Sequence, residues 1–133
     1  MVTSMFVTLP VADPVKSLEF YKAVGFSIDP RFADGSASCV ALNDKVSLML
    51  GSKEQFAQVS PRPPVDPTKG NQVLMSLNCE SREEVDEMVK KAIAAGGSQA
   101  HDPEDYGFMY QSAFYDLDGH GWGLTWMNPN PAK

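Results

Sequence analysis

The stretch FVTLPVADPVKSLEFYKAVG, residues 6–25, predicts a strand that is followed directly by a helix. Apolar and polar residues alternate through Phe6–Val11, as in a strand with one buried face. Asp13 is a good N-cap, Pro14 suits the first turn, and apolar residues then recur at helical spacing as far as Gly25. We therefore expect a helix over Pro14–Val24.

The same order of elements returns in the second half of the chain. Val73–Asn78 predicts a strand, and Arg82–Ala95 predicts a helix that opens with a Ser-x-x-Glu capping box and ends at two glycines. A predicted hairpin follows each helix: Ala37–Leu42 with Val46–Leu50 in the first half, and Met109–Tyr115 with Gly121–Met127 in the second. The repeat predicts an α+β fold of two tandem βαβββ modules, whose curved mixed sheet forms a cup-shaped cavity.

The boundaries of the modules follow from the segment between them. Gly51–Asn71 contains four prolines and is interpreted as a linker, with one short helical turn at Lys53–Val59. We predict one domain over residues 1–133, made of module 1 (about 1–60) and module 2 (about 70–133). Ser98–Phe108 is predicted to be a long loop, and the tail after Asn128 is expected to fray.

Composition narrows the classes of function. The chain has 133 residues and a formal net charge of -6, with no cluster of Lys and Arg, which argues against nucleic acid and membrane surfaces as partners. Cys39 and Cys79 have no Cys or His neighbour at the spacing of metal ligands, which favours a reducing compartment. No apolar run approaches about 18 residues. We expect a cytoplasmic protein.

Alternation along the strands divides their side chains between two faces. The more apolar face should meet the helices, and the other should line the cup. The expected cup residues are Phe6, Thr8, Ser47, Met49, Gln72, Leu74, Ser76, Gly123, Thr125 and Met127. The segment Tyr106–Tyr110 is the best binding candidate, because Tyr and Met suit a semi-apolar pocket, although its side chains could equally pack the core and rim. Phe108, Tyr110 and Gln111 therefore join the candidate ligand-binding residues.

Several of these motifs resemble the vicinal oxygen chelate superfamily over nearly the whole chain. The superfamily includes glyoxalase I, extradiol dioxygenases and the bleomycin and fosfomycin resistance proteins. The resemblance rests on LPV at 9–11, FY at 20–21, GF at 25–26, SREEVD at 81–86, AGG at 95–97, DYGFMY at 105–110 and DGH at 118–120. The branch that looks most similar is that of small bacterial glyoxalase-like proteins, the predicted lactoylglutathione lyases. The resemblance also implies a homodimer.

In metal-dependent members of this superfamily, four strands each contribute one ligand. Carried over by position, these ligands fall on Phe6, on Ser47 or its neighbour Leu48, on Gln72 and on Gly123. A divalent metal site normally needs three or four His, Cys or carboxylate groups, so no metal ligand and no cofactor is predicted here.

Three functions remain open. The first is a metal-independent protein that binds, and thereby sequesters, a small organic molecule in the cup. The second is a metal-dependent lyase, isomerase or dioxygenase of the glyoxalase I type, with Gln72 and either His101 or His120 as unorthodox ligands. The third is a module that interacts through its surface. No catalytic residue can be assigned, because both histidines lie in predicted loops and no Ser-His-Asp or Cys-His pattern is present.

Overall fold

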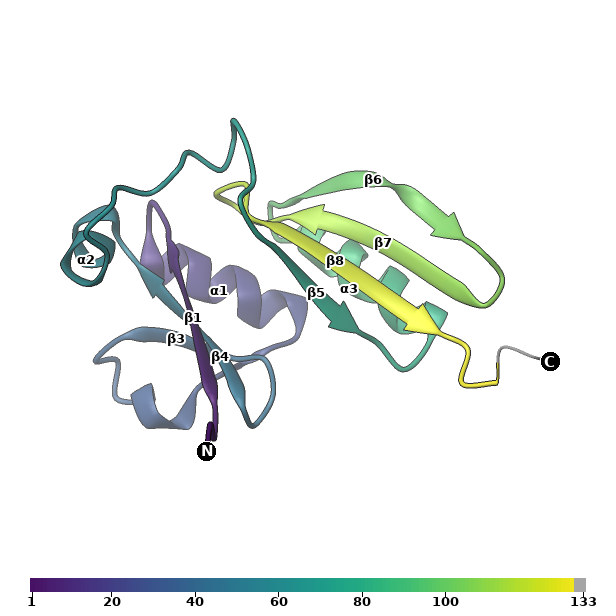
Figure 1. Ribbon diagram of the computed structural model, residues 1–133, viewed down its shortest axis with the longest axis horizontal. Helices are drawn as coiled ribbons and strands as arrows, with labels where there is room; N and C mark the ends of the chain where they lie inside the picture. Colours follow the sequence, from purple (N-terminus) through teal and green to yellow (C-terminus); the bar gives the residue numbers. More distant parts are fainter. Residues whose placement is uncertain (131–133) are drawn as a thin grey trace. The chain divides into compact units, whose positions relative to one another are not determined.

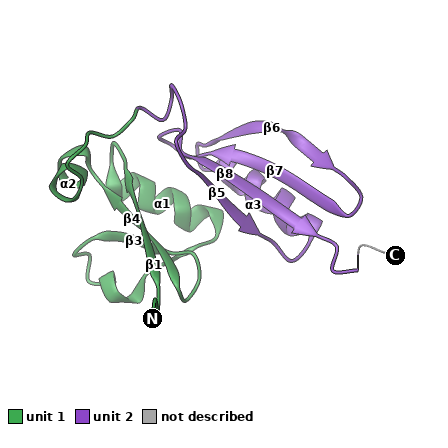
Figure 2. Ribbon diagram, viewed as in Figure 1, with its two compact units in different colours: residues 1–65 green, residues 66–133 purple. Residues whose placement is uncertain are grey.

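A computed structural model describes residues 1–130 of the chain. The chain divides into two compact units, residues 1–65 and 66–133 (Figure 2). The fold class is confirmed as α+β, because each unit runs βαβββ and contains one four-stranded mixed sheet. That the two modules form one domain stays a prediction.

Unit 1 contains the first sheet and three helical segments (Figure 1). The strand order is β1-β4-β3-β2, with β1 parallel to β4 and the other pairs antiparallel. The elements are β1 (Met5–Pro10), α1 (Pro14–Val24), β2 (Ser27–Ile28), the 3-10 helix η1 (Pro30–Phe32), β3 (Ser38–Ala41), β4 (Val46–Gly51) and α2 (Lys53–Val59).

Helix α1 covers one face of this sheet. Asp13 caps it by accepting hydrogen bonds from the backbone N–H groups of Val15 and Lys16. Gly25 ends it at a φ of 127°, a conformation that favours glycine. The helix buries Phe20, Tyr21 and Val24, and the strand residues that face it, such as Val40 and Leu48, are fully buried. The face of the sheet away from α1 is called the open face of unit 1 below.

Unit 2 repeats the plan with longer strands. The strand order is β5-β8-β7-β6, again with one parallel pair, β5 with β8. Its elements are β5 (Leu74–Asn78), α3 (Arg82–Ala94), β6 (Ser98–Asp105), β7 (Met109–Tyr115) and β8 (Gly121–Met127). Helix α3 buries Val85, Val89 and Ala92 on the side of the sheet where Phe114 and Trp122 stack with their ring centroids 6.1 Å apart. The opposite face is the open face of unit 2.

One predicted element is wrong. Ser98–Phe108 is not a loop, because most of it forms the edge strand β6, paired with β7. The pairing is irregular, with register shifts on both sides of His101, and Pro103 lies in the strand. Proline is tolerated in an edge strand, and bulges disturb the regular alternation of side chains. The polar sequence and the proline therefore concealed the strand.

Three further predictions concern the start of β5, the helices and the C-terminal tail. Val73, predicted as the first residue of a strand, precedes β5 and is 62% exposed. None of the helices within residues 1–130 is long and apolar enough to cross a membrane. The tail that was expected to fray after Asn128 extends into residues 131–133, which lie outside the described residues.

Candidate functional site

Four of the predicted cup residues share the open face of unit 1. Phe6 lies opposite Ser47, and Thr8 lies opposite Met49, in the parallel pairing of β1 with β4. Successive residues of a strand point to opposite faces, so these two pairs form neighbouring rows that both turn away from the buried Leu48. The pairing thus places these four residues on one face, as alternation indicated, and that this face binds a ligand stays a prediction.

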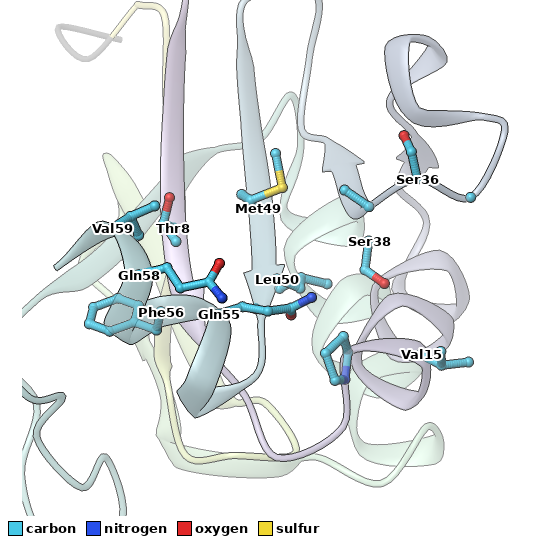
Figure 3. A pocket seen from close by; sticks show the side chains of 14 residues that line it. Thr8, Val15, Ser36, Ser38, Met49, Leu50, Gln55, Phe56, Gln58 and Val59 are labelled. Carbon is cyan, nitrogen blue, oxygen red and sulfur yellow. The ribbon is translucent and has the colours of Figure 1, made fainter.

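A cavity of about 570 Å³ opens on the Thr8–Met49 row (Figure 3). This volume lies within the range of small-molecule sites. Its wall is completed by helix α2 and by residues 35–38, which end the loop after η1, include the first residue of β3 and are called loop 35–38. The lining residues of α2 are Gln55, Phe56, Gln58 and Val59.

Helix α2 contributes two amide side chains to the cavity, in addition to the hydroxyls of Thr8, Ser36 and Ser38. Its first turn is fixed by a capping box, in which Ser52 Oγ accepts from the Gln55 N–H and Gln55 Oε1 accepts from the Ser52 N–H. Figure 3 shows Gln55 and Gln58 reaching from α2 toward β4, where Met49 lies. The cavity thus combines apolar walls with two amide groups. The sequence analysis found the helical turn but did not assign α2 to a site.

A buried carboxylate lies beside the Phe6–Ser47 row. Asp29 is only 2% exposed and accepts four hydrogen bonds. Three come from Arg31, namely from its backbone N at 2.9 Å, its Nε at 3.0 Å and its Nη2 at 2.6 Å, and one comes from Ser47 Oγ at 2.7 Å. The Arg31 guanidinium, followed by the Ser47 hydroxyl, holds the pKa of Asp29 well below its usual range. Asp29 is therefore ionised throughout the ordinary pH range.

The Arg31 guanidinium lies over the ring of Phe6. Its central carbon is 4.5 Å from the ring centroid, a cation–π distance, and Phe32 packs its ring edge-on against Phe6 at 6.4 Å. The Asp29 carboxylate raises the pKa of Arg31 still further, so the cation is permanent. Sequence reasoning missed Asp29 and Arg31. The Asp-Pro-Arg order does predict a capped turn, but the bond to Ser47 spans 18 residues and has no local pattern.

Cys39 lies on the same open face, opposite Met49 in the pairing of β3 with β4. It is fully buried. Burial, and then the negative charge of Asp29, raise the pKa of the Cys39 thiol to about 11. A thiol of this kind is protonated near neutral pH, so it does not act as a nucleophile.

The open face of unit 2 carries the remaining predicted strand residues. Gln111 lies opposite Thr125 in the β7–β8 pairing, and Gly123 lies opposite Ser76 in the β5–β8 pairing. Leu74 is 67% exposed at the start of β5. Gln72 precedes β5 and is also exposed.

Tyr110 points to the helix side of unit 2, which differs from the expectation that it lines the cup. Its hydroxyl donates to Asp86 Oδ1 of α3 at 2.5 Å, and this bond raises the pKa of Tyr110 to about 12. The Arg82 guanidinium lies 5.3 Å from the centre of the same ring. The prediction placed Tyr110 and Gln111 together, but neighbours in a strand point to opposite faces. Phe108 is 51% exposed in the turn before β7.

Neither histidine is placed with acidic groups in a metal-binding geometry. The exposed His101 has Nδ1 at 2.7 Å from the carbonyl oxygen of Asp102 and at 3.6 Å from a carboxylate oxygen of Glu104. His120 lies in the β7–β8 turn, where its backbone N–H, like those of Asp118 and Gly119, donates to Asp116 Oδ1. The turn thus accounts for the Asp-Gly-His motif.

The four inherited ligand positions do not fit a metal ion. Phe6 offers a ring that already faces a guanidinium, and Ser47 is buried with its hydroxyl donated to Asp29. Gly123 has no side chain, which leaves the amide of Gln72. Within residues 1–130 no three His, Cys, Asp or Glu side chains gather as metal ligands would.

Comparisons with known proteins agree on one family. The model of the Glyoxalase/Bleomycin resistance protein/Dioxygenase superfamily matches residues 5–124. A solved structure of the hypothetical protein SA1046 from S. aureus shares 33% identity, covers 94% of each chain and superposes with a TM-score of 0.79.

More distant structures show the same fold. A glyoxalase/bleomycin resistance protein/dioxygenase family enzyme from Burkholderia phytofirmans PsJN has 22% identity and a TM-score of 0.68, with 92% of this chain and 96% of that chain covered. A glyoxalase-related enzyme from Fulvimarina pelagi has 16% identity and a TM-score of 0.71, with 95% and 88% covered. A search of the curated proteins gives no match. On the family match and its extent, this chain belongs to the Glyoxalase/Bleomycin resistance protein/Dioxygenase superfamily.

Proposed function

We propose that this protein binds a small, partly apolar organic molecule on the open face of unit 1, without a metal ion. The observation that carries the proposal is the cavity on the Thr8–Met49 row, next to the Phe6–Ser47 row, where two of the expected ligand positions carry no His, Cys or carboxylate. Binding of this kind would sequester the molecule rather than convert it.

The lining of the cavity supports a semi-apolar ligand. Met49, Phe56 and Val59 supply apolar and adaptable surface, and Gln55 and Gln58 supply amide donors and acceptors. In sites for small molecules, mostly apolar walls bury the ligand, and a small number of polar groups fix its orientation. No side chain in this lining is a candidate general base, because Asp, Glu and His are absent from it.

Homodimer formation is part of the proposal. Strands β1 and β5 are edge strands of their sheets, and exposed apolar side chains lie on them, among them Met5 and Leu74. An apolar edge strand that remains open to water favours pairing with another chain. Sedimentation analysis of the untagged protein tests this, and a monomer at all concentrations would contradict it.

The test of binding uses one substitution that fills the cavity and one control substitution outside it. Thr8→Phe places a ring on the floor of the cavity, and Thr125→Phe makes the same change on the open face of unit 2. Aromatic fragments are screened by ¹H–¹⁵N NMR on protein that was stripped of metal and then measured with and without added Zn²⁺, Ni²⁺, Mn²⁺ or Fe²⁺.

The expected result is that fragments shift the amide signals of loop 35–38 and α2, that Thr8→Phe abolishes these shifts, and that added metal changes nothing. Loss of binding in Thr125→Phe alone would move the site to unit 2. Stoichiometric metal binding that is needed for fragment binding would overturn the metal-independent function and favour a glyoxalase-type enzyme.

A further inference from the structure

The open face of unit 1 carries a second feature that the cavity does not explain. The Arg31 guanidinium lies over Phe6, and Arg31 and Ser47 both donate to Asp29. Phe6 and Ser47 are two of the positions at which the resemblance to the superfamily places metal ligands. A guanidinium has five N–H donors. Two of them, on Nε and Nη2, go to Asp29, so three have no partner among the described residues.

The carboxylate that holds Arg31 has no capacity left for a ligand. Both oxygens of Asp29 already accept two hydrogen bonds each, and its side chain is only 3% exposed. The Arg31 side chain, in contrast, is 53% exposed. The negative end of the pair is thus buried, and the positive end faces outward from the sheet. An approaching molecule meets a fixed cation with free donors.

The cation lies one row of side chains away from the cavity, whose lining includes Thr8 and Met49 but not Phe6, Ser47 or Arg31. Phe6 and Thr8 are two residues apart on β1, which places their side chains roughly 7 Å apart on the same face. Ser47 and Met49 repeat this spacing on β4. The residues 35–38 that line the cavity are separated from the end of η1 by two residues, and Arg31 is the middle residue of η1.

From this juxtaposition we infer that the ligand is an organic carboxylate. Its carboxylate would bind the free N–H groups of Arg31, and its apolar or aromatic body would extend along the open face past Phe6 and enter the cavity at Thr8 and Met49. This inference rests on the proposed function and names the chemical class of its ligand. A planar guanidinium with parallel N–H groups matches a carboxylate, and such charge-assisted pairs are stronger than neutral hydrogen bonds.

Matched pairs of probes test the inference on the intact protein. Benzoate and phenylacetate are compared with benzamide and phenylacetamide, which have nearly the same shape without the charge, and phenylphosphonate separates a carboxylate from another oxyanion. The readout is the Arg31 Nε–H resonance together with the amide signals of loop 35–38. We expect benzoate to bind about tenfold more tightly than benzamide, or better, and to shift the Nε–H resonance.

Variants locate the effect. Arg31→Gln should remove the preference for the carboxylate over the amide, and Arg31→Lys, which keeps a charge beside Asp29, should retain only part of it. Arg82→Gln is the control, because Arg82 is the comparable arginine on the helix side of unit 2. It should keep the full preference. If Arg31→Gln fails to fold, the inference is still tested by the comparison of benzoate with benzamide on the wild-type protein and on Arg31→Lys.

The outcomes separate this inference from the proposed function. Benzoate and benzamide could bind with equal affinity and shift signals in the cavity but not the Arg31 Nε–H. This result would overturn the inference that the ligand is a carboxylate and leave the proposed binding function intact. Tighter binding of phenylphosphonate than of benzoate would replace the carboxylate by a tetrahedral oxyanion and so overturn the ligand class. If none of the probes shifts any signal of unit 1, both proposals fall together.

Discussion

Each unit places one arginine over an aromatic ring and against an aspartate, but on opposite sides of its sheet. In unit 1, Arg31 pairs with Asp29 and lies over Phe6 on the open face. In unit 2, Arg82 pairs with Asp105 and lies near the rings of Tyr110 and Trp126, on the helix side. The same combination of arginine, aspartate and aromatic ring therefore has a different role in each unit.

The position of the carboxylate decides which purpose is served. Asp105 is 52% exposed, and Arg82 also donates to the carbonyl oxygen of Gly107 at 3.0 Å, so this arginine fastens the β6–β7 turn to α3. Asp29 is buried and orients Arg31 without covering it. An exposed pair contributes little to stability, whereas a buried carboxylate depends on its partners. A buried aspartate therefore holds its arginine in one orientation, which an exposed aspartate does not do.

The largest effects on stability are expected from substitutions in the core between the sheet and the helix of each unit. Trp122→Ala removes the largest fully buried side chain of unit 2 and should lower the free energy of unfolding by about 3–5 kcal/mol. Leu48→Ala in unit 1 should lower it by about 2–5 kcal/mol. Urea denaturation followed by circular dichroism measures both.

The exposed Ile93 of α3 provides the control. It is 44% exposed, so Ile93→Ala should change the free energy of unfolding by no more than about 0.5 kcal/mol. A change in Trp122→Ala as small as that of the control would mean that the helix-side core of unit 2 is not packed as described.

The next effect tests the comparison itself, through its dependence on pH. The pKa of Asp29 is lowered by Arg31 and then Ser47, and the pKa of Asp105 is lowered by Arg82 and then the Gly107 N–H. A lowered pKa in the folded state gives stability that is complete above the unfolded value of 3.8 and is lost as the pH falls through the folded value.

Asn variants at the two positions should therefore differ. Asp29→Asn should lower the urea midpoint clearly at pH 7 and flatten its fall below pH 3.8, because it leaves Arg31 and Ser47 without a charged acceptor. Asp105→Asn should shift the midpoint only slightly, since this carboxylate is half exposed. Equal shifts would show that burial does not distinguish the two pairs.

This contrast also explains how far the sequence could predict the molecule. The helices capped by Asp13 and Ser81, the hairpins and the face shared by Thr8 and Met49 all follow from local patterns that span a few residues. The burial of Asp29 does not, because it requires η1 to fold back onto β4, 18 residues along the chain. Strand β6 was missed for a related reason: an edge strand with bulges lacks the alternation by which strands are recognised.

The smallest effect compares the two cysteines, one in each unit, and it concerns reactivity rather than fold. The pKa of Cys39 rises from 9.0 to about 11 through burial and then the charge of Asp29, and that of Cys79 rises to about 11 through burial and then the charge of Glu84. Because the folded state disfavours the thiolate, the raised pKa leaves stability unchanged well below pH 9 and lowers it as the pH rises from 9 through about 11.

Alkylation by iodoacetamide, followed by mass spectrometry, should therefore be slow for both thiols at pH 8 and should accelerate toward pH 11, because only the thiolate reacts. Cys79 should react first, because it is partly exposed, whereas Cys39 is fully buried beneath the open face and waits for local opening. Asp29→Asn removes the second cause of the raised Cys39 pKa and should speed the reaction of Cys39 without altering that of Cys79. A Cys39 rate that is unchanged in this variant would mean that Asp29 does not control the electrostatics of the open face. The role of Asp29 in orienting Arg31 would then lose its support.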